Sequence, residues 1–182
     1  MSGFLLTDDL RKIETKFGIE LGHVPPTSAD SSRYYPQFDQ EIRAQAAEMA
    51  AHYELFYCLE QSIRELIVTT LFEKSGAIWW GSGTVPAKIV EDVAGRIQRE
   101  KDSGFSQRSD REIDYTNFGE LSVIITSNWD VFGAIFSSKR AVERIMSSLN
   151  LLRGPIAHCS PLAPDEVDRL LLTVKDWFRS MS

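Results

Sequence analysis

The chain has 182 residues, of which 43% are hydrophobic and 25% are charged, and its formal net charge is −6. This length is enough for one domain whose core needs no metal ion or disulfide for stability. The negative net charge argues against extensive electrostatic binding of nucleic acid, because non-specific binding requires many phosphates to be neutralised. A small local basic site is compatible with this charge.

The N-terminal part is predicted to be an arm. Thr7, followed by two aspartates, starts a helix whose apolar residues share one face until Gly18 ends it. Residues 19–36 carry prolines and serines without a helical period, so we expect an extended connector. We therefore divide the chain into an arm at 1–36 and a domain at 37–182.

The domain begins with an unusually long helix. Between residues 38 and 74, apolar side chains recur at spacings of three and four with no glycine or proline between them. A second helix is predicted to have Thr84 as its cap and Pro86 in its first turn, and to end before Asp102. The polar segment 105–115 is predicted to be a loop.

Three further helical segments complete the domain. One begins at Phe118, the next is capped by Ser137 or Ser138, and the last opens at Pro164. The predicted inward face of the last helix comprises Val167, Leu170, Leu171, Val174, Trp177 and Phe178. Because no region alternates with a period of two, the fold class is predicted to be an all-α helical bundle.

The sequence contains neither a membrane-spanning or secretory segment nor a metal-binding cysteine pattern. The longest apolar stretches are far shorter than the roughly 20 residues that span a bilayer, and the first residues lack the pattern of a secretory signal, so we expect a cytoplasmic protein without membrane contact. Cys58 and Cys159 form no CxxC pair and have no histidine at zinc-like spacing. No metal site, cofactor or disulfide framework is therefore expected.

Near the end of the chain, an arginine, a glycine-proline pair and a histidine lie within the sequence RGPIAH. In an unbroken helix, Arg153 and His158 would point roughly 140° away from each other. Pro155 has no amide hydrogen and its ring clashes with the carbonyl of Leu151, while Gly154 accepts dihedrals that other residues avoid. We therefore predict that the helix kinks or ends here, which can bring the two side chains to one surface.

This arrangement resembles the RxxxxH signature of HEPN-domain proteins, in particular the HEPN domain of an mRNA-surveillance endoribonuclease. Two more segments are similar to helices of that domain: YELFYCLEQSIRELI at 53–67 and DYTNFGELSVIITSNWDVF at 114–132. The resemblance implies a HEPN-like bundle, here preceded by a helical arm, that forms a homodimer with the active site at its interface. It also implies metal-independent cleavage of an RNA substrate, roles in toxin-antitoxin pairs or phage defence, and hence an antitoxin or defence-system partner.

The chemistry of this cleavage suits the two motif residues. The ribose 2′-hydroxyl must lose a proton as it attacks the adjacent phosphate, and a histidine, with an unperturbed pKa of about 6.5, exchanges protons near neutral pH. His158 is the candidate acid or base. Arg153 is the candidate stabiliser, because a planar guanidinium can form two parallel hydrogen bonds to the negatively charged transition state. Two copies at a dimer interface would supply one histidine for each proton transfer.

Two groups of charged residues are candidates for supporting roles. Glu60 and Arg64 can support the site from the long helix, although an exposed pair four residues apart is an equally good interpretation. Lys139, Arg140 and Arg144 lie on the helix that leads to the motif and can bind an RNA backbone, whereas a solvated helix face is the commoner explanation of such charges.

Endoribonuclease activity is the leading hypothesis, and two alternatives stay open. Gly154 stands where many catalytic HEPN motifs have a polar residue. Together with the acidic net charge, this glycine favours a second hypothesis, a non-catalytic HEPN module that binds RNA or a protein partner. A third hypothesis is an assembly domain, in which the long helix and the arm at 1–36 bind other chains.

Overall fold

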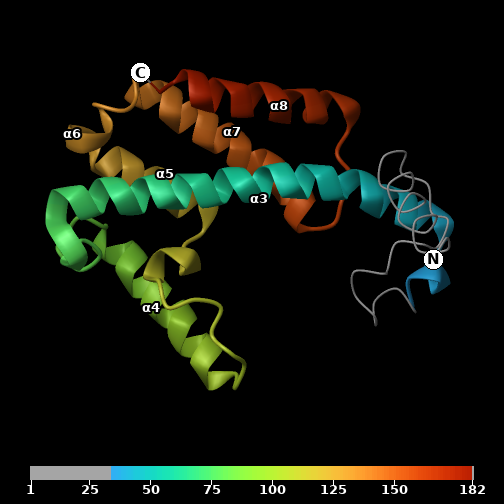
Figure 1. Cartoon of the computed structure of the whole chain (residues 1–182), viewed down its shortest axis with the longest axis horizontal. Coiled ribbons are helices and arrows are strands. Elements are labelled where there is room, and N and C mark those ends of the chain that lie inside the picture. Colours follow the sequence, from blue (N-terminus) through green and yellow to red (C-terminus); the bar gives the residue numbers. More distant parts are fainter. Residues whose placement is uncertain (1–33, 182) are drawn as a thin grey trace, which may run out of the picture. The chain divides into compact units, whose positions relative to one another are not determined.

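The computed structural model describes residues 34–181, and this part of the chain is all-α, as predicted (Figure 1). The helix predicted between Thr7 and Gly18 lies outside the described residues. Within residues 34–181 no strand forms, and a single bridge between Phe136 and Met181 provides the one β-type pairing. None of the described helices is both long enough and apolar enough to cross a bilayer.

Six α-helices and three short 3-10 helices make up the described residues. The α-helices are α3 (Gln40–Ser75), α4 (Ala87–Asp102), α5 (Phe118–Ser127), α6 (Trp129–Phe132), α7 (Lys139–Ala157) and α8 (Pro164–Arg179). The 3-10 helices are η1 (Tyr35–Gln37), η2 (Gly76–Ile78) and η3 (Glu112–Tyr115). The chain divides into two compact units at 1–46 and 47–182, and η1 and the start of α3 belong to the first. The boundary predicted at residue 37 stays a prediction.

Helix α3 is one continuous helix of 36 residues, which confirms the long helix predicted from the apolar spacing. Its buried apolar side chains recur every three or four residues and therefore lie on one face. They are Phe56, Leu59, Ile63, Ile67 and Leu71. The helix ends where Gly76 adopts a φ of +68°, a left-handed conformation that favours glycine and stops a helix.

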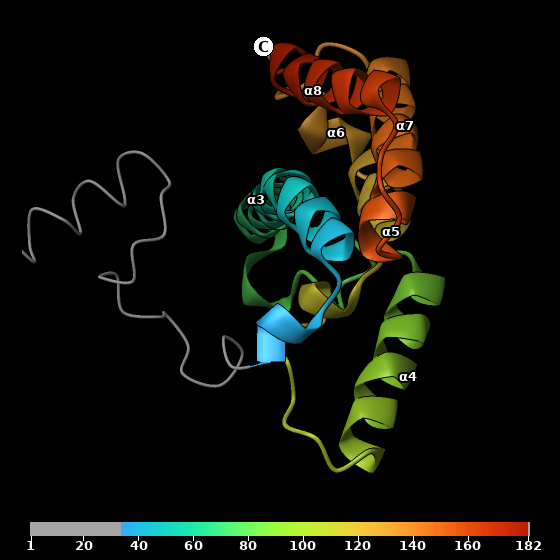
Figure 2. The ribbon, with the colours of Figure 1, turned by 90° about the vertical axis from the view of Figure 1, so that its right-hand side faces the viewer.

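The core of the second unit lies where α3, α5, α7 and α8 bring their apolar faces together. Helix α7 packs against α5 on one side and against α8 on the other, as both views show (Figures 1 and 2). The largest fully buried side chains include Trp177, Tyr115, Phe118, Phe132 and Phe136. Truncation of one such aromatic side chain to alanine typically costs about 3–5 kcal/mol of stability.

Helix α8 turns a narrower face inward than the sequence predicts. Leu170 and Trp177 are fully buried, whereas Leu171 and Phe178 are 53% and 57% exposed. Their inward assignment is wrong because α8 packs mainly against α7, so only a narrow stripe of its surface is covered. The exposed leucine and phenylalanine lie at the flank of that stripe.

The helix ends of the second unit show one wrong prediction and one missed cap. Thr84 does not cap α4, because its hydroxyl pairs with that of Ser82 at 2.5 Å and the cap position is Pro86. Helix α5 starts with a capping box, in which Asn117 donates its backbone N–H to Glu120 at 2.7 Å. The predicted cap of α7 by Ser138 is confirmed by the hydrogen bond that its hydroxyl accepts from the Ala141 amide.

Candidate active site

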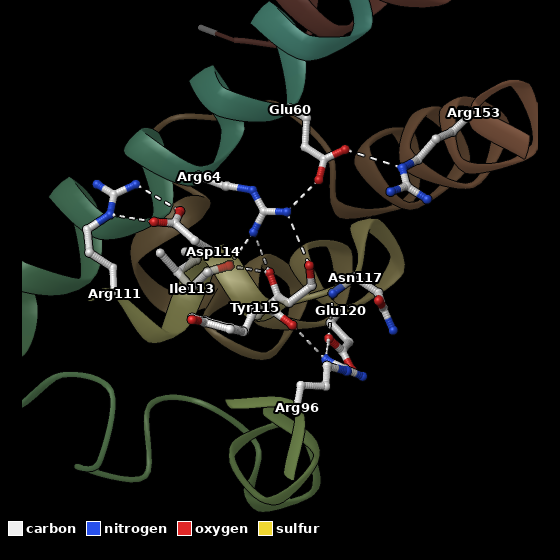
Figure 3. Close-up of polar contacts among 11 residues, drawn as sticks. Glu60, Arg64, Arg96, Arg111, Ile113, Asp114, Tyr115, Asn117, Glu120 and Arg153 are labelled. Atoms are coloured by element: carbon white, nitrogen blue, oxygen red, sulfur yellow. Dashed lines mark hydrogen bonds and ion pairs between the residues drawn. The ribbon is translucent and has the colours of Figure 1, made fainter. Parts of the chain in front are cut away.

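Arg153 lies in the penultimate turn of α7, and its side chain faces α3. The guanidinium Nε donates a hydrogen bond to Glu60 Oε2 at 3.3 Å, and the Arg153 side chain is 41% exposed. Figure 3 shows no contact from the two terminal nitrogens of Arg153 to any residue drawn. Glu60 therefore orients the guanidinium through Nε and leaves its terminal N–H groups available to a ligand.

Glu60 is itself held by a second arginine. Arg64, one helical turn further along α3, donates from Nη2 to Glu60 Oε1 and is 5% exposed. Two arginines thus flank one carboxylate that is only 14% exposed, so the trio carries one net positive charge (Figure 3). The structure brings Glu60 and Arg64 together with Arg153, as a supporting role requires, and the exposed-pair alternative is wrong.

Arg64 also fixes the chain segment that precedes α5. Its Nη1 donates to Thr116 Oγ1 at 2.8 Å and to the Ile113 carbonyl, and its Nη2 donates to the Thr116 carbonyl at 3.1 Å. The Thr116 carbonyl follows the end of the 3-10 helix η3, where backbone acceptors lack helical partners and attract a cation, whereas the Ile113 carbonyl also accepts from the Thr116 amide and hydroxyl. Arg64 therefore joins α3, η3 and the Arg153 site in one buried network.

The segment 105–115, predicted to be a polar loop, contains η3, the part of this network that the sequence prediction missed. Ile113 and Tyr115 are 1% and 2% exposed and anchor η3 in the core. The signal was present in the sequence, because two apolar residues stand two apart in an otherwise polar stretch. What the sequence does not reveal is the partner, since Arg64 lies about 50 residues away along the chain.

Asp114, on the outer side of η3, is held by two donors. Arg111 donates to its carboxylate from Nε and Nη2, both at 3.0 Å, and the Ser109 hydroxyl donates to Oδ2. Burial alone would raise the pKa of Asp114, but the hydrogen bonds from Arg111 and Ser109 outweigh it and lower that pKa below its usual value. The carboxylate form therefore stabilises the folded state.

This gives a pH-dependent prediction for stability. The lowered pKa of Asp114 implies a contribution that is fully present above about pH 5 and is lost as the pH falls below about 4. Asp114→Asn should therefore lower the thermal unfolding midpoint at pH 7 and lower it less at pH 3, because part of the contribution is lost below the ordinary pKa of an aspartate. Asp110→Asn, in the same exposed segment, serves as the control. An equal loss at both pH values for Asp114→Asn would contradict the assignment.

The end of α7 differs from the prediction made for the glycine-proline pair. The helix does not end at Gly154 but runs on through Pro155 to Ala157. Pro155 removes only one amide donor, and the helical pattern resumes with the His158 amide donating to the Gly154 carbonyl at 3.0 Å. Cys159 then adopts a φ of +55°, and the chain turns away.

His158 is the C-terminal cap residue of α7 and its side chain is exposed. The pocket beside Arg153 has a volume of about 230 Å³, and His158 is absent from its lining. Its walls are Tyr53, Phe56, Tyr57, Glu60 and Gln61 from α3, and Arg153, Ile156 and Ala157 from α7. Within one chain, the structure therefore places Arg153 in the pocket and His158 outside it.

The remaining candidate residues lie elsewhere on α7. Lys139 and Arg140 are exposed in the first turn of the helix, about 20 Å from Arg153 along the helix axis, and Arg144 is exposed about 13 Å away. These three residues do not contribute to the pocket. Their predicted contact with an RNA backbone stays a prediction. In residues 34–181, no three His, Cys, Asp or Glu side chains are grouped so that they can hold a metal ion.

Comparison with known proteins places the chain in a family. The family model described as Swt1-like HEPN matches residues 54–182, a range that includes α3 from Glu54 onward, the η3 segment and the RxxxxH motif. No curated protein and no solved structure matches the chain. The match covers well over half of the chain and contains Glu60, Arg64, Arg153 and His158, so the resemblance seen in the motif is confirmed. The chain belongs to the Swt1-like HEPN family.

Proposed function

We propose that this protein is a metal-independent endoribonuclease. The observation that carries the proposal is the guanidinium of Arg153, which Glu60 holds through Nε at the edge of a pocket while its terminal N–H groups stay available. A guanidinium fixed in this way can bind a phosphate by two parallel hydrogen bonds without reorganising during the reaction. HEPN family membership is consistent with this chemistry.

The reaction is an attack of a ribose 2′-hydroxyl on the adjacent phosphorus. One base removes the 2′-hydroxyl proton, the bond from phosphorus to the 5′-oxygen of the next nucleotide breaks, and one acid protonates that oxygen. The products are a 2′,3′-cyclic phosphate and a free 5′-hydroxyl. His158 is the proposed proton-transfer group, and Arg153 stabilises the charge on the phosphorane.

We propose further that the active form is a homodimer with the site at its interface. Each chain contributes one His158, which lies outside the pocket that contains its own Arg153. A second copy of the chain would supply the histidine that the pocket lacks, so that a dimer would hold two sites, each with Arg153 of one chain and His158 of the other.

The biological setting is part of the same proposal. We place the protein in the cytoplasm as a toxin or phage-defence effector, acting on RNA and restrained by an antitoxin or a partner from the same defence system. An effector of this kind needs such restraint, because an endoribonuclease without tight sequence selection damages the RNA of its own cell.

One observation favours a second function, a non-catalytic module that binds RNA or a protein partner. Gly154, beside Arg153, offers no polar side chain, and no packing demand explains it. Its φ lies outside the left-handed range, and no atom lies within 4 Å of where a Cβ would stand. A polar residue would therefore fit at this position, and its absence is consistent with a site that binds RNA without cleaving it.

The test is cleavage of mixed RNA by the purified full-length chain in excess EDTA, with mapping of the new ends. Arg153→Ala and His158→Ala should each reduce cleavage at least about 100-fold, because one removes charge stabilisation and the other proton transfer. His52→Ala is the matched control and should leave cleavage unchanged. Intact RNA with all four proteins, accompanied by RNA binding, would support the non-catalytic module instead.

A further inference from the structure

The pocket beside Arg153 has aromatic walls that the proposed chemistry does not use. Tyr53 and Tyr57 stand one turn apart on α3, with ring centroids 6.1 Å apart and planes tilted by 32°. The two residues are 59% and 54% exposed, although they border a pocket. Both rings border the pocket and are exposed enough to stack with a ligand that enters it.

The floor of the pocket is apolar and rigid. Phe56 is 4% exposed and packs against Phe118 of α5, with a ring centroid distance of 5.2 Å. Ile156, from the last turn of α7, packs against the same core. The recess therefore has a fixed shape, and its volume of about 230 Å³ lies below the range of about 300–1,000 Å³ that holds drug-sized ligands. It suits a ligand of the size of a single heterocycle.

Polar groups stand at one side of this apolar recess. Gln61 is half-buried and lines the pocket, and its amide has no hydrogen-bond partner among the described residues. An amide offers both a donor and an acceptor, which matches the edge of a nucleobase. Arg153 contributes positive charge at the same recess, and the negative charge of Glu60 is offset by its two arginine partners.

We propose that this recess, formed by Tyr53, Phe56, Tyr57, Gln61 and Ile156, binds one unstacked base of single-stranded RNA next to the phosphate that Arg153 holds. The proposal rests on the proposed function, because it extends the same site. The base stacks on the tyrosine rings and its edge meets the Gln61 amide. Paired bases in a duplex are excluded, since their faces are covered by their neighbours in the stack.

The test measures RNA affinity by fluorescence anisotropy with the full chain carrying His158→Ala, so that the labelled 12-nucleotide RNA stays intact. Tyr57→Leu and Tyr53→Leu should each weaken binding of the single strand about tenfold, whereas Tyr57→Phe, which keeps the ring, should change it less than about twofold. Binding of the same sequence as a duplex should not respond to these substitutions.

Phe72→Leu provides the matched control. Phe72 is 53% exposed on the same helix but about 22 Å from Tyr57 along its axis, so its loss should leave RNA affinity unchanged. Circular dichroism of each variant verifies the fold, and the Phe variant keeps the test valid if a Leu variant unfolds.

The outcomes separate this inference from the proposed function. If the tyrosine variants bind RNA tenfold more weakly and the native chain does not cleave RNA, the base site is supported and the proposed nuclease activity is wrong. Unchanged single-strand affinity in an active nuclease overturns the base site and leaves the nuclease standing. If Tyr57→Leu instead halves the mass measured by light scattering without altering RNA affinity, the tyrosines belong to a contact between copies and the inference is wrong.

Discussion

Replacing Arg64 with methionine is expected to lower the free energy of unfolding by about 3–5 kcal/mol, because one partner of a buried ion pair is removed. Methionine keeps most of the aliphatic stem, so lost packing contributes little. The loss arises at four acceptors to which Arg64 donates in the folded state: the Glu60 carboxylate, the Thr116 hydroxyl and the carbonyls of Ile113 and Thr116. Without Arg64, Glu60 keeps only Arg153 as its partner and the Thr116 carbonyl loses its donor, and both losses are costly in a buried site.

Urea unfolding followed by far-ultraviolet circular dichroism measures this change. Arg99→Met is the control, because Arg99 is exposed on α4 and bonds only the Gly95 carbonyl of its own helix among the described residues. The control should shift the free energy of unfolding by no more than about 0.5 kcal/mol. Similar shifts for the two variants would mean that Arg64 does not hold η3 against α3.

A double variant separates the two contributions to the stability lost in Arg64→Met, the ion pair with Glu60 and the hydrogen bonds to backbone carbonyls. Combining Arg64→Met with Glu60→Leu removes the carboxylate that has lost the more buried of its two arginine partners, so the double variant should be more stable than Arg64→Met alone. It should not reach the stability of the native chain, because the Thr116 carbonyl stays without its donor and the Ile113 carbonyl loses one of its three. Full recovery would assign the whole effect to the ion pair.

The local features of the fold were predictable from the sequence. The apolar spacing of α3 and the absence of glycine and proline fix a continuous helix, and Ser138 marks the start of α7. Each of these depends on residues within one or two turns of each other. The inward face of α8 was less predictable, because exposure of Leu171 and Phe178 depends on which neighbouring helices are present rather than on periodicity.

The candidate site was predictable in its motif and not in its geometry. The RxxxxH pattern identifies Arg153 and His158, and the spacing of Glu60 and Arg64 indicates that they can pair. Whether that pair is exposed depends on η3, which lies about 50 residues away along the chain and brings its carbonyls to Arg64. Contacts of this separation leave no periodic signal, so burial of the pair could not be derived from spacing.

The proline in the motif illustrates a related limit. The loss of one amide donor at Pro155 and the permissive Gly154 predict that α7 kinks or ends; it does not end there but continues to Ala157, and a kink stays a prediction. Pro155 deprives only the Leu151 carbonyl of its donor, and the hydrogen bond from the His158 amide to the Gly154 carbonyl closes the turn that follows. Because α7 does not end at Gly154, the chain does not turn there to bring His158 toward Arg153. The proposed dimer would supply His158 from a second chain.

If the active site is shared between two chains, inactive variants should complement each other. Arg153→Ala supplies an intact His158, and His158→Ala supplies an intact Arg153. When equal amounts are unfolded together and refolded, half of the dimers contain one chain of each kind, and each such dimer has one complete site of two. Cleavage should therefore return to about a quarter of the native level, although each variant alone is inactive.

A second mixture tests the same arrangement by the activity that is lost rather than by the activity that is regained. Native chains refolded with the double variant, which lacks both Arg153 and His158, form mixed dimers in which every shared site misses one group. Activity per total protein should then also be about a quarter of native, contributed by native dimers alone, whereas a site complete within one chain would give about half. A silent first mixture together with half activity in the second would place the whole site in one chain, and His158 would then have to reach the Arg153 pocket by a rearrangement of the end of α7.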